Sequence, residues 1–343
     1  MGRSSSLLPP ALRWAGPFLA AGYGLGTRID RALSTPRPAP LPTICIGNIT
    51  VGGTGKTPAV KHFARELAAR GRKPAVLLRG YKGQGSDEAA ELRTALADLK
   101  IPILIGADRL ASARLAWEQG CDVALLDDGF QHWRLARDLD IVLVDATDPF
   151  GGGHLAPWGR LREGPAALAR AGAVIISRAD AVPADELSAV EKAVARHAPQ
   201  AALARARHKP VGLRDCLDDK ARLSLEKLKG TPLLAACGLG NPVGFLETLR
   251  QLGANLRDTM CFPDHHQYGA RELDSCLIPA ARNAGAQAIV VTEKDAAKLR
   301  PVLAGVSFPI WVLTVAFVIL EGQDAVWARV GAALQAGDKR RSG

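Results

Sequence analysis

The chain has 343 residues, of which 48% are hydrophobic and 23% are charged, and its formal net charge is +10. A chain of this length accommodates two domains with their own cores, and its composition excludes long disordered segments and a protein that crosses a membrane many times. The six cysteines are scattered without metal-ligand spacing, which indicates reduced thiols and a cytosolic protein.

Residues 1–40 join an apolar segment to a basic one. The segment 7–26, LLPPALRWAGPFLAAGYGLG, is nearly all apolar, and residues 1–40 hold five arginines against one aspartate. Twenty helical residues could cross a hydrocarbon layer of about 30 Å, but the prolines, the arginine and the glycines favour a helix that lies in the membrane interface. A cleaved signal peptide is the alternative, and it is disfavoured because it would export a nucleotide-binding loop and unpaired cysteines.

A glycine-rich segment at residues 47–58, GNITVGGTGKTP, is typical of a phosphate-binding loop. In such a loop backbone N–H groups surround the phosphates, Lys56 reaches the β/γ oxygens and Thr57 offers a hydroxyl group to Mg²⁺. The predicted phosphate-binding residues are Gly52, Gly53, Thr54, Gly55, Lys56 and Thr57. The strict pattern has a glycine where this chain has Thr50, and the alternative is an ordinary glycine-rich turn. The flanking pattern supports the loop, because a predicted strand (42–46) precedes it and a predicted helix (58–70) follows.

Apolar runs and helical patterns alternate after this loop, which predicts a parallel sheet covered by helices. The strands are expected at 75–78, 101–105, 123–126, 141–144 and 174–176, and helices at 109–118 and 186–197. A second series is expected at 233–237, 241–252, 255–262, 271–284, 288–292, 311–315 and 324–336. We therefore predict an α/β fold of the P-loop NTPase type with a second, smaller α/β lobe and an N-terminal membrane-associated helix. The predicted parts are the helix (1–40), the P-loop core (41–205), a linker (206–230) and the smaller lobe (231–343).

Two adjacent acids end one of the predicted strands, in the sequence VALLDDGFQH at residues 123–132. The carboxyl ends of parallel strands meet at one edge of the sheet, so Asp127 and Asp128 are expected beside the phosphate-binding loop. Carboxylates at that place would hold hydrated Mg²⁺ against ATP. Strand-end acids also cap helices, and the pairing with GGTGKT favours the metal role.

Three further segments carry weaker signals. LLRGYKGQGSDE (77–88) places Asp87 after a glycine-rich loop, and FPDHHQY (262–268) contains two adjacent histidines. A flexible loop with a solvated aspartate, and a simple turn, are the plain alternatives. GGGHLAPWGRLRE (151–163) is a glycine-rich loop with two arginines and an acid, as expected of a segment that clamps phosphate or gates a substrate. The sequence TEKD (292–295) is consistent with a helix cap.

Taken in order, these motifs resemble one family, the bacterial tetraacyldisaccharide 4′-kinases, or lipid A 4′-kinases. The resemblance runs from about residue 7 to residue 299, and it is carried most specifically by GNITVGGTGKTP and DDGFQH. Thr50 agrees with the form of the loop in this family. The small departures are Leu78, Lys82 and Ala89, where serine, glycine and proline are usual.

The resemblance implies a kinase that transfers the γ-phosphoryl group of ATP to the 4′-hydroxyl of a tetraacylated glucosamine disaccharide 1-phosphate, giving lipid IVA. It implies that Asp87 accepts the hydroxyl proton and that His265 pairs with it. It also implies that Asp127, Asp128 and Glu163 serve Mg²⁺ and its water shell. The expected location is the cytoplasmic face of the bacterial inner membrane, with a peripheral or monotopic attachment through the N-terminal helix. No protein partner is implied.

Two other classes of protein are weighed against this family. A regulatory P-loop GTPase or metallochaperone should carry an NKxD-type guanine reader, and the nearest match in the sequence is TEKD at residues 292–295. A nucleic-acid-binding NTPase would fit the positive charge, but it should interleave basic and aromatic residues along one face. Aromatic residues are only 5% of this chain, so we expect no nucleic-acid partner.

Overall fold

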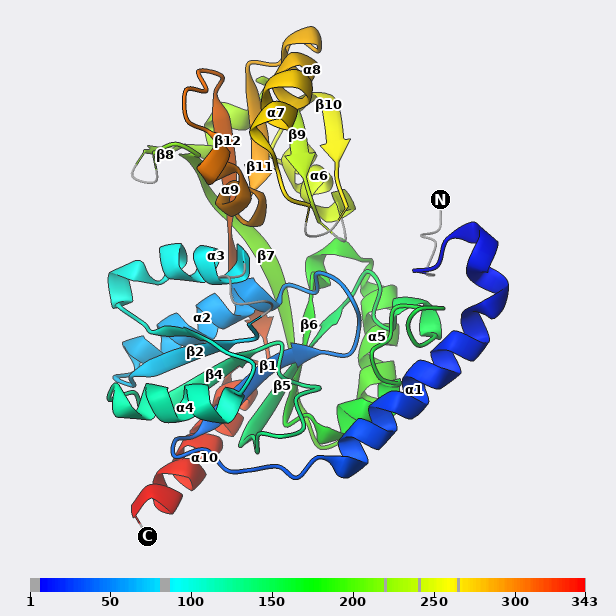
Figure 1. The fold of residues 1–343 in the computed structure, drawn as a ribbon, viewed down its shortest axis with the longest axis vertical. Coiled ribbons are helices and arrows are strands. Elements are labelled where there is room, and N and C mark those ends of the chain that lie inside the picture. The colour runs from blue at the N-terminus through cyan, green and yellow to red at the C-terminus, as the bar shows by residue number, and fades with distance from the viewer. Residues whose placement is uncertain (1–6, 81–86, 219–220, 240–241, 264–265, 343) are drawn as a thin grey trace. The chain divides into compact units, whose positions relative to one another are not determined.

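The computed structural model describes residues 7–80, 87–218, 221–239, 242–263 and 266–342 (Figure 1). Its contacts divide the chain into two compact units, residues 1–208 with 317–343, and residues 209–316. Strands β7 (Ala202–Asp215) and β12 (Ile310–Glu321) both continue from one unit into the other. The chain therefore passes between the two units twice, and each crossing lies within a strand.

The first unit is built on a parallel sheet whose strands follow the order β3-β2-β4-β1-β5-β6-β7. Its other strands are β1 (Thr43–Asn48), β2 (Pro74–Leu78), β3 (Ile103–Ile105), β4 (Val123–Asp127), β5 (Leu139–Asp145) and β6 (Ala173–Ser177). Strands β1, β2, β4 and β6 are buried along their whole length. Continuous apolar runs of this kind are typical of parallel strands that helices cover on both faces.

Helices cover both faces of this sheet, each with its own apolar core. Helices α2 (Lys56–Ala69), α3 (Asp87–Ala95) and α10 (Gln323–Ser342) contribute to one core. Helices α4 (Arg109–Glu118) and α5 (Ala184–His197) contribute to the other. Because β1 lies between β4 and β5, the residues that follow it emerge at the middle of the sheet's carboxyl edge.

The N-terminal helix α1 (Gly16–Leu33) follows a 3₁₀ helix (Pro10–Ala15). Its buried residues are small ones, Gly16 and Ala20, and a Cβ added to Gly16 would meet Trp158 at 2.7 Å. Its large apolar side chains face outward instead, with Trp14 of the preceding turn 75% exposed and Phe18 76% exposed. Among the described residues, no helix combines the length and apolar character needed to cross a membrane.

The second unit carries a smaller parallel sheet in the order β10-β9-β11-β12. Its elements are β8 (Arg222–Leu223), β9 (Pro232–Cys237), α6 (Pro242–Gln251), β10 (Asn255–Cys261), α7 (Ala270–Glu272), a π-helical turn (Leu273–Leu277), α8 (Ile278–Asn283), β11 (Ala288–Thr292) and α9 (Glu293–Leu299). Helix α6 packs on one face, and α8 and α9 pack on the other.

The TEKD segment caps α9, as the sequence suggested. The Thr292 side chain accepts a hydrogen bond from the Asp295 backbone N–H. Asp295 itself is fully buried and accepts hydrogen bonds from the Gly238 N–H at 2.9 Å and the Tyr268 hydroxyl at 3.1 Å. This carboxylate joins the ends of β9 and β11 to the segment that follows β10, so its role is structural.

The predicted α/β fold of the P-loop type is confirmed by these two sheets and their helices. Two features differ from the expectations. The segment 206–215, expected in a linker, lies in β7, which pairs with β6 in the first unit and with β8 in the second. Residues 317–343, expected in the smaller lobe, belong to the first unit, where Val326 and Val330 of α10 pack into the core beside α2.

Candidate active site

The segment between β1 and α2 forms a tight turn at the carboxyl edge of the first unit's sheet. Gly52 has a φ of 113° and Gly55 a φ of 88°, a backbone region that side chains with a Cβ rarely adopt. Gly55 is the N-cap of α2, which begins at Lys56. Thr50, at the position where the strict pattern has glycine, is buried and forms a β-bridge with Leu161, so no glycine is required there.

Side chains from two other segments hold the carbonyl groups of this turn. Arg160 donates to the Val51 carbonyl at 2.8 Å, and Arg178 donates to the Gly53 carbonyl at 3.1 Å. The Ser177 hydroxyl donates to the Thr54 carbonyl at 2.9 Å. In a planar trans peptide unit the C=O of one residue and the N–H of the next point in opposite directions. The bonds to the Val51 and Thr54 carbonyls therefore turn the N–H groups of Gly52 and Gly55 away from the anchoring side chains, while the Thr54 N–H donates to the Gly52 carbonyl at 3.1 Å. A turn of this kind ahead of a helix N-terminus is suited to bind phosphate.

The two predicted acids lie beside this turn. Asp127 pairs with Ile46 across β4 and β1, and the Asp128 N–H donates to the Ile46 carbonyl at 3.0 Å. The Asp128 carboxylate lies 3.8 Å from the Lys56 Nζ and accepts hydrogen bonds from Arg162 at 2.8 and 2.9 Å. The structure therefore brings Lys56, Asp127 and Asp128 together, as the motifs predicted.

The two acids have opposite electrostatic environments. Burial, with the neighbouring charge of Asp128, raises the pKa of Asp127 to about 8, although Lys56 opposes this shift. Burial acts on Asp128 too, but Lys56 and Arg162 outweigh it and hold the pKa of Asp128 below its usual value. A buried carboxyl group (Asp127) beside a partly exposed, cation-paired one (Asp128) offers the oxygen donors that suit a divalent cation.

Glu163 is linked to the turn through Gln131. The Gln131 side chain donates to the Asn48 carbonyl and to Glu163, both at 3.0 Å. Arg170 donates to the same Glu163 oxygen at 2.9 Å. Within the described residues, no group of three or more histidine, cysteine or acidic side chains is arranged to hold a metal ion by itself. Mg²⁺ in phosphate sites normally takes one or two carboxylates and completes its shell with phosphates and water, so the acids here fit such an ion.

The remaining two predicted residues are not tested by the structure. Asp87 is the first residue of α3, but its side chain is outside the part of the chain that the structure describes. His265 lies outside the described residues altogether. The described neighbour of that histidine, His266, stacks on Phe262 at a ring distance of 4.4 Å and binds Glu272 at 3.0 Å.

Several residues of the site were not singled out by the motifs. The Asn48 amide donates to the Thr54 hydroxyl at 3.0 Å, and Ser177 and Arg178 hold the turn from the end of β6. Arg109, only 2% exposed at the start of α4, donates to the Gly106 carbonyl at 2.6 Å. Burial, Arg109 and other arginines lower the pKa of His132 to about 4, so this histidine is neutral near pH 7. These are isolated residues that form no motif with regular spacing, so the sequence does not reveal them. Only the order of the strands in the sheet brings them to the turn.

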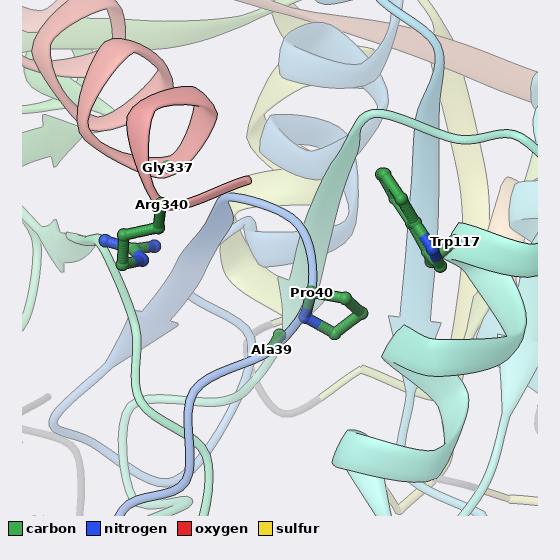
Figure 2. A pocket seen from close by; sticks show the side chains of 5 residues that line it. All are labelled: Ala39, Pro40, Trp117, Gly337 and Arg340. Atoms are coloured by element: carbon green, nitrogen blue, oxygen red, sulfur yellow. The ribbon is translucent and has the colours of Figure 1, made fainter. Parts of the chain in front are cut away.

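A separate hollow of about 250 Å³ lies beside the segment that leads into β1, and Figure 2 shows the side chains that line it. It is lined by Ala39, Pro40, Trp117, Gly337 and Arg340. The phosphate-binding turn follows the opposite end of β1, and this hollow includes none of the predicted site residues. It is therefore distinct from the candidate active site.

Comparison with known proteins gives consistent matches. The chain matches the model of the tetraacyldisaccharide-1-phosphate 4′-kinase family over residues 12–335. The tetraacyldisaccharide 4′-kinase of Anaeromyxobacter dehalogenans is 43% identical over 93% of this chain and 89% of its own length. The kinase of that name from Geobacter metallireducens is 40% identical over 83% of this chain and 85% of its own length. The fold is also similar to that of LpxK from Aquifex aeolicus, crystallised in complex with ATP, with a TM-score of 0.70, 23% identity and coverage of 94% and 99% of the two chains.

We expect Gly55→Ala to lower the free energy of unfolding of the ligand-free protein by at least about 2 kcal/mol. Alanine is strained in the left-handed backbone conformation of this residue, and its Cβ would be too close to a neighbouring side chain. An added Cβ would lie 2.3 Å from the His208 ring. Gly53→Ala is the matched control in the same turn, since nothing lies within 4 Å of its Cβ, and its effect should stay within about 0.5 kcal/mol. Urea unfolding measures both, and equal losses would contradict this account of the turn.

Proposed function

The chain belongs to the tetraacyldisaccharide-1-phosphate 4′-kinase family, and we propose that it transfers the γ-phosphoryl group of ATP to the 4′-hydroxyl of a tetraacylated glucosamine disaccharide 1-phosphate. The product is the 4′-phosphorylated lipid A precursor, lipid IVA. The observation that carries this proposal is the phosphate-binding turn with Lys56 and two acids beside it, in a chain that matches this family along nearly its whole length.

In this proposal the turn binds the phosphates of ATP. The N–H groups around Gly52 to Thr57 and the N-terminus of α2 offer partial positive charge, and Lys56 adds a full charge at the β/γ oxygens. Phosphoryl transfer depends mainly on positioning and on neutralising charge in the transition state. The anchors of the turn support this role, because they fix the binding groups before the nucleotide arrives.

We assign the Thr57 hydroxyl, Asp127 and Asp128 to Mg²⁺, with Glu163 acting on its water shell. Bound Mg²⁺ would neutralise charge on the phosphate oxygens. Arg162 holds the Asp128 carboxylate from one side, and Gln131 with Arg170 holds Glu163. These contacts orient the two carboxylates whether or not an ion is bound.

We assign the acceptor chemistry to Asp87 and His265. A sugar hydroxyl is a weak nucleophile, and a carboxylate within hydrogen-bond reach can take its proton as the phosphoryl group arrives. His265 would pair with Asp87 as the second member of a catalytic dyad and would support its carboxylate as the proton acceptor. The support for this pair is the match of SDE and FPDHHQY to the family's motifs.

We propose that α1 attaches the enzyme to the cytoplasmic face of the inner membrane as a peripheral or monotopic protein. Its small residues pack inward, while its Phe18 and Leu25, and Trp14 of the preceding 3₁₀ helix, are exposed, Leu25 by 60%. Exposed apolar side chains beside arginines are the features of an interfacial helix on an anionic membrane. A substrate with four acyl chains stays in the bilayer, so an attached enzyme meets it at the surface.

Lys56→Ala should lower kcat by about 100-fold or more, because it removes charge stabilisation from the transition state. The assay follows labelled phosphate from ATP to a panel of acceptors that includes the disaccharide lipid and nucleic acid, with GTP as a second donor. Lys192→Ala, an exposed lysine on α5, is the control and should leave kcat unchanged. Near-normal activity of a folded Lys56→Ala protein, or labelling of nucleic acid instead of the lipid, would contradict the proposed function.

Asp87→Ala and His265→Ala should each slow transfer at saturating Mg²⁺ and ATP, and the double variant should be little slower than the slower single one. Residues that act as one catalytic unit give non-additive losses. Asp127→Ala should instead raise the Mg²⁺ concentration needed for half-maximal activity. If added Mg²⁺ also restored Asp87→Ala, Asp87 would be a metal ligand and not the base.

Replacing Trp14, Phe18 and Leu25 together with serine should weaken sedimentation with anionic liposomes at least about tenfold, because each apolar side chain contributes roughly 1.5–3 kcal/mol when buried. Binding of ATP should be unaffected. The matched control replaces Leu115 and Trp117 of α4, which are 44% and 40% exposed, with serine. Equal liposome binding by wild type and the α1 variant would show that this helix is not the membrane contact.

A further inference from the structure

The loop that follows β6 is fastened to the phosphate-binding turn by two consecutive side chains. Ser177, fully buried, donates to the Thr54 carbonyl at 2.9 Å, and Arg178 donates to the Gly53 carbonyl at 3.1 Å. Arg178, which has a φ of 52°, also forms an ion pair with Asp145 at the end of β5. The distance from this loop to any phosphate bound in the turn is therefore fixed by the fold.

The strand order decides which way a bound nucleotide extends. Asp127 ends β4 and Asp128 follows it, on one side of β1, whereas β5 and β6 lie on the other side of β1. The γ-phosphoryl group must face the acids that hold its metal ion, so the nucleoside extends toward the ends of β5 and β6. Ligands of open parallel sheets occupy this carboxyl edge. The loop after β6 is then the protein segment that borders the base.

One side chain on this loop is available to contact a base. Asp180 lies in the short 3₁₀ turn Ala179–Ala181, directly after the two anchoring residues, and it is exposed. Within the described chain its carboxylate has no hydrogen-bond or ion-pair partner. The carboxylate of Asp145, by contrast, already has partners: it forms an ion pair with Arg178 and accepts hydrogen bonds from the Thr147 N–H and hydroxyl. An ionised carboxylate only accepts hydrogen bonds, so it suits a base that presents N–H donors.

We propose that the loop Ser177–Ala181 is the base-binding wall of the nucleotide site, and that Asp180 contacts the purine by accepting a hydrogen bond from its amino or ring N–H group. This inference rests on the proposed binding of ATP at the turn. The TEKD segment does not serve as a base reader, because its Asp295 is fully buried and already bonded to Gly238 and Tyr268.

The test measures dissociation constants by calorimetry for Mg²⁺ complexes of ATP, GTP and purine riboside triphosphate, without a phosphoryl acceptor. The last nucleotide has the purine ring but neither an amino group nor a ring N–H. A hydrogen bond to a charged group changes affinity by about tenfold or more, so wild type should bind ATP at least about tenfold more tightly than purine riboside triphosphate. Asp180→Ala should remove this difference by weakening ATP and GTP while leaving purine riboside triphosphate unchanged.

Two further variants make the result specific. Asp180→Asn keeps the shape and one acceptor oxygen, so it should retain part of the preference. Asp185→Ala removes another exposed aspartate from the start of α5 and should behave as wild type. Equal weakening of all three nucleotides by Asp180→Ala, or no weakening of any, would overturn the assignment of Asp180. Failure of the wild-type protein to bind any of them would contradict the proposed function itself.

Discussion

The fixed turn between β1 and α2 is the constraint on which the rest of the site depends. Its carbonyl groups at Val51, Gly53 and Thr54 are bonded to Arg160, Arg178 and Ser177. These donors come from the loop before residue 163 and from the end of β6. A binding loop that is held from outside has little conformational entropy left to lose when a ligand arrives, so more of its interaction energy is available for binding. The same bonds set the positions of both neighbouring segments.

Charge balance beside the turn follows from the same arrangement. Asp128 is neutralised by Lys56 and Arg162, whereas Asp127 is buried with a raised pKa. The site therefore holds one carboxylate that is paired with two cations and one buried carboxyl group whose raised pKa favours the neutral form near pH 7. Binding of a cation together with phosphates would change this balance most at Asp127 and Lys56. Arg162 orients the Asp128 carboxylate through two hydrogen bonds.

The second unit has a comparable internal constraint. Asp295 binds the chain after β9 and the segment that contains Tyr268, and it shares a capping interaction with Thr292. Burial of a carboxylate is costly unless its oxygens are bonded, and here both are. The chain on the C-terminal side of residues 264–265 is thereby tied to the sheet of this unit. The two motifs FPDHHQY and TEKD are therefore connected in the structure by the hydrogen bond from Tyr268 to Asp295.

The sequence by itself determined the local elements and the chemistry of the motifs. Periodicity located α4 and β11 at their observed bounds. The position of DDGFQH at the end of a predicted strand also predicted that its two acids lie beside the loop that carries Lys56, and Lys56 lies 3.8 Å from Asp128. These features depend on residues close in the chain or on the general rule that parallel strands share a carboxyl edge. Tertiary structure alone decided that residues 317–343 return to the first unit, that β7 continues through the expected linker, and that Ser177 and Arg178 hold the turn. These outcomes depend on contacts between separate segments, such as the bonds of Ser177 and Arg178 to residues more than 100 positions away, and such contacts leave no periodic pattern in the sequence.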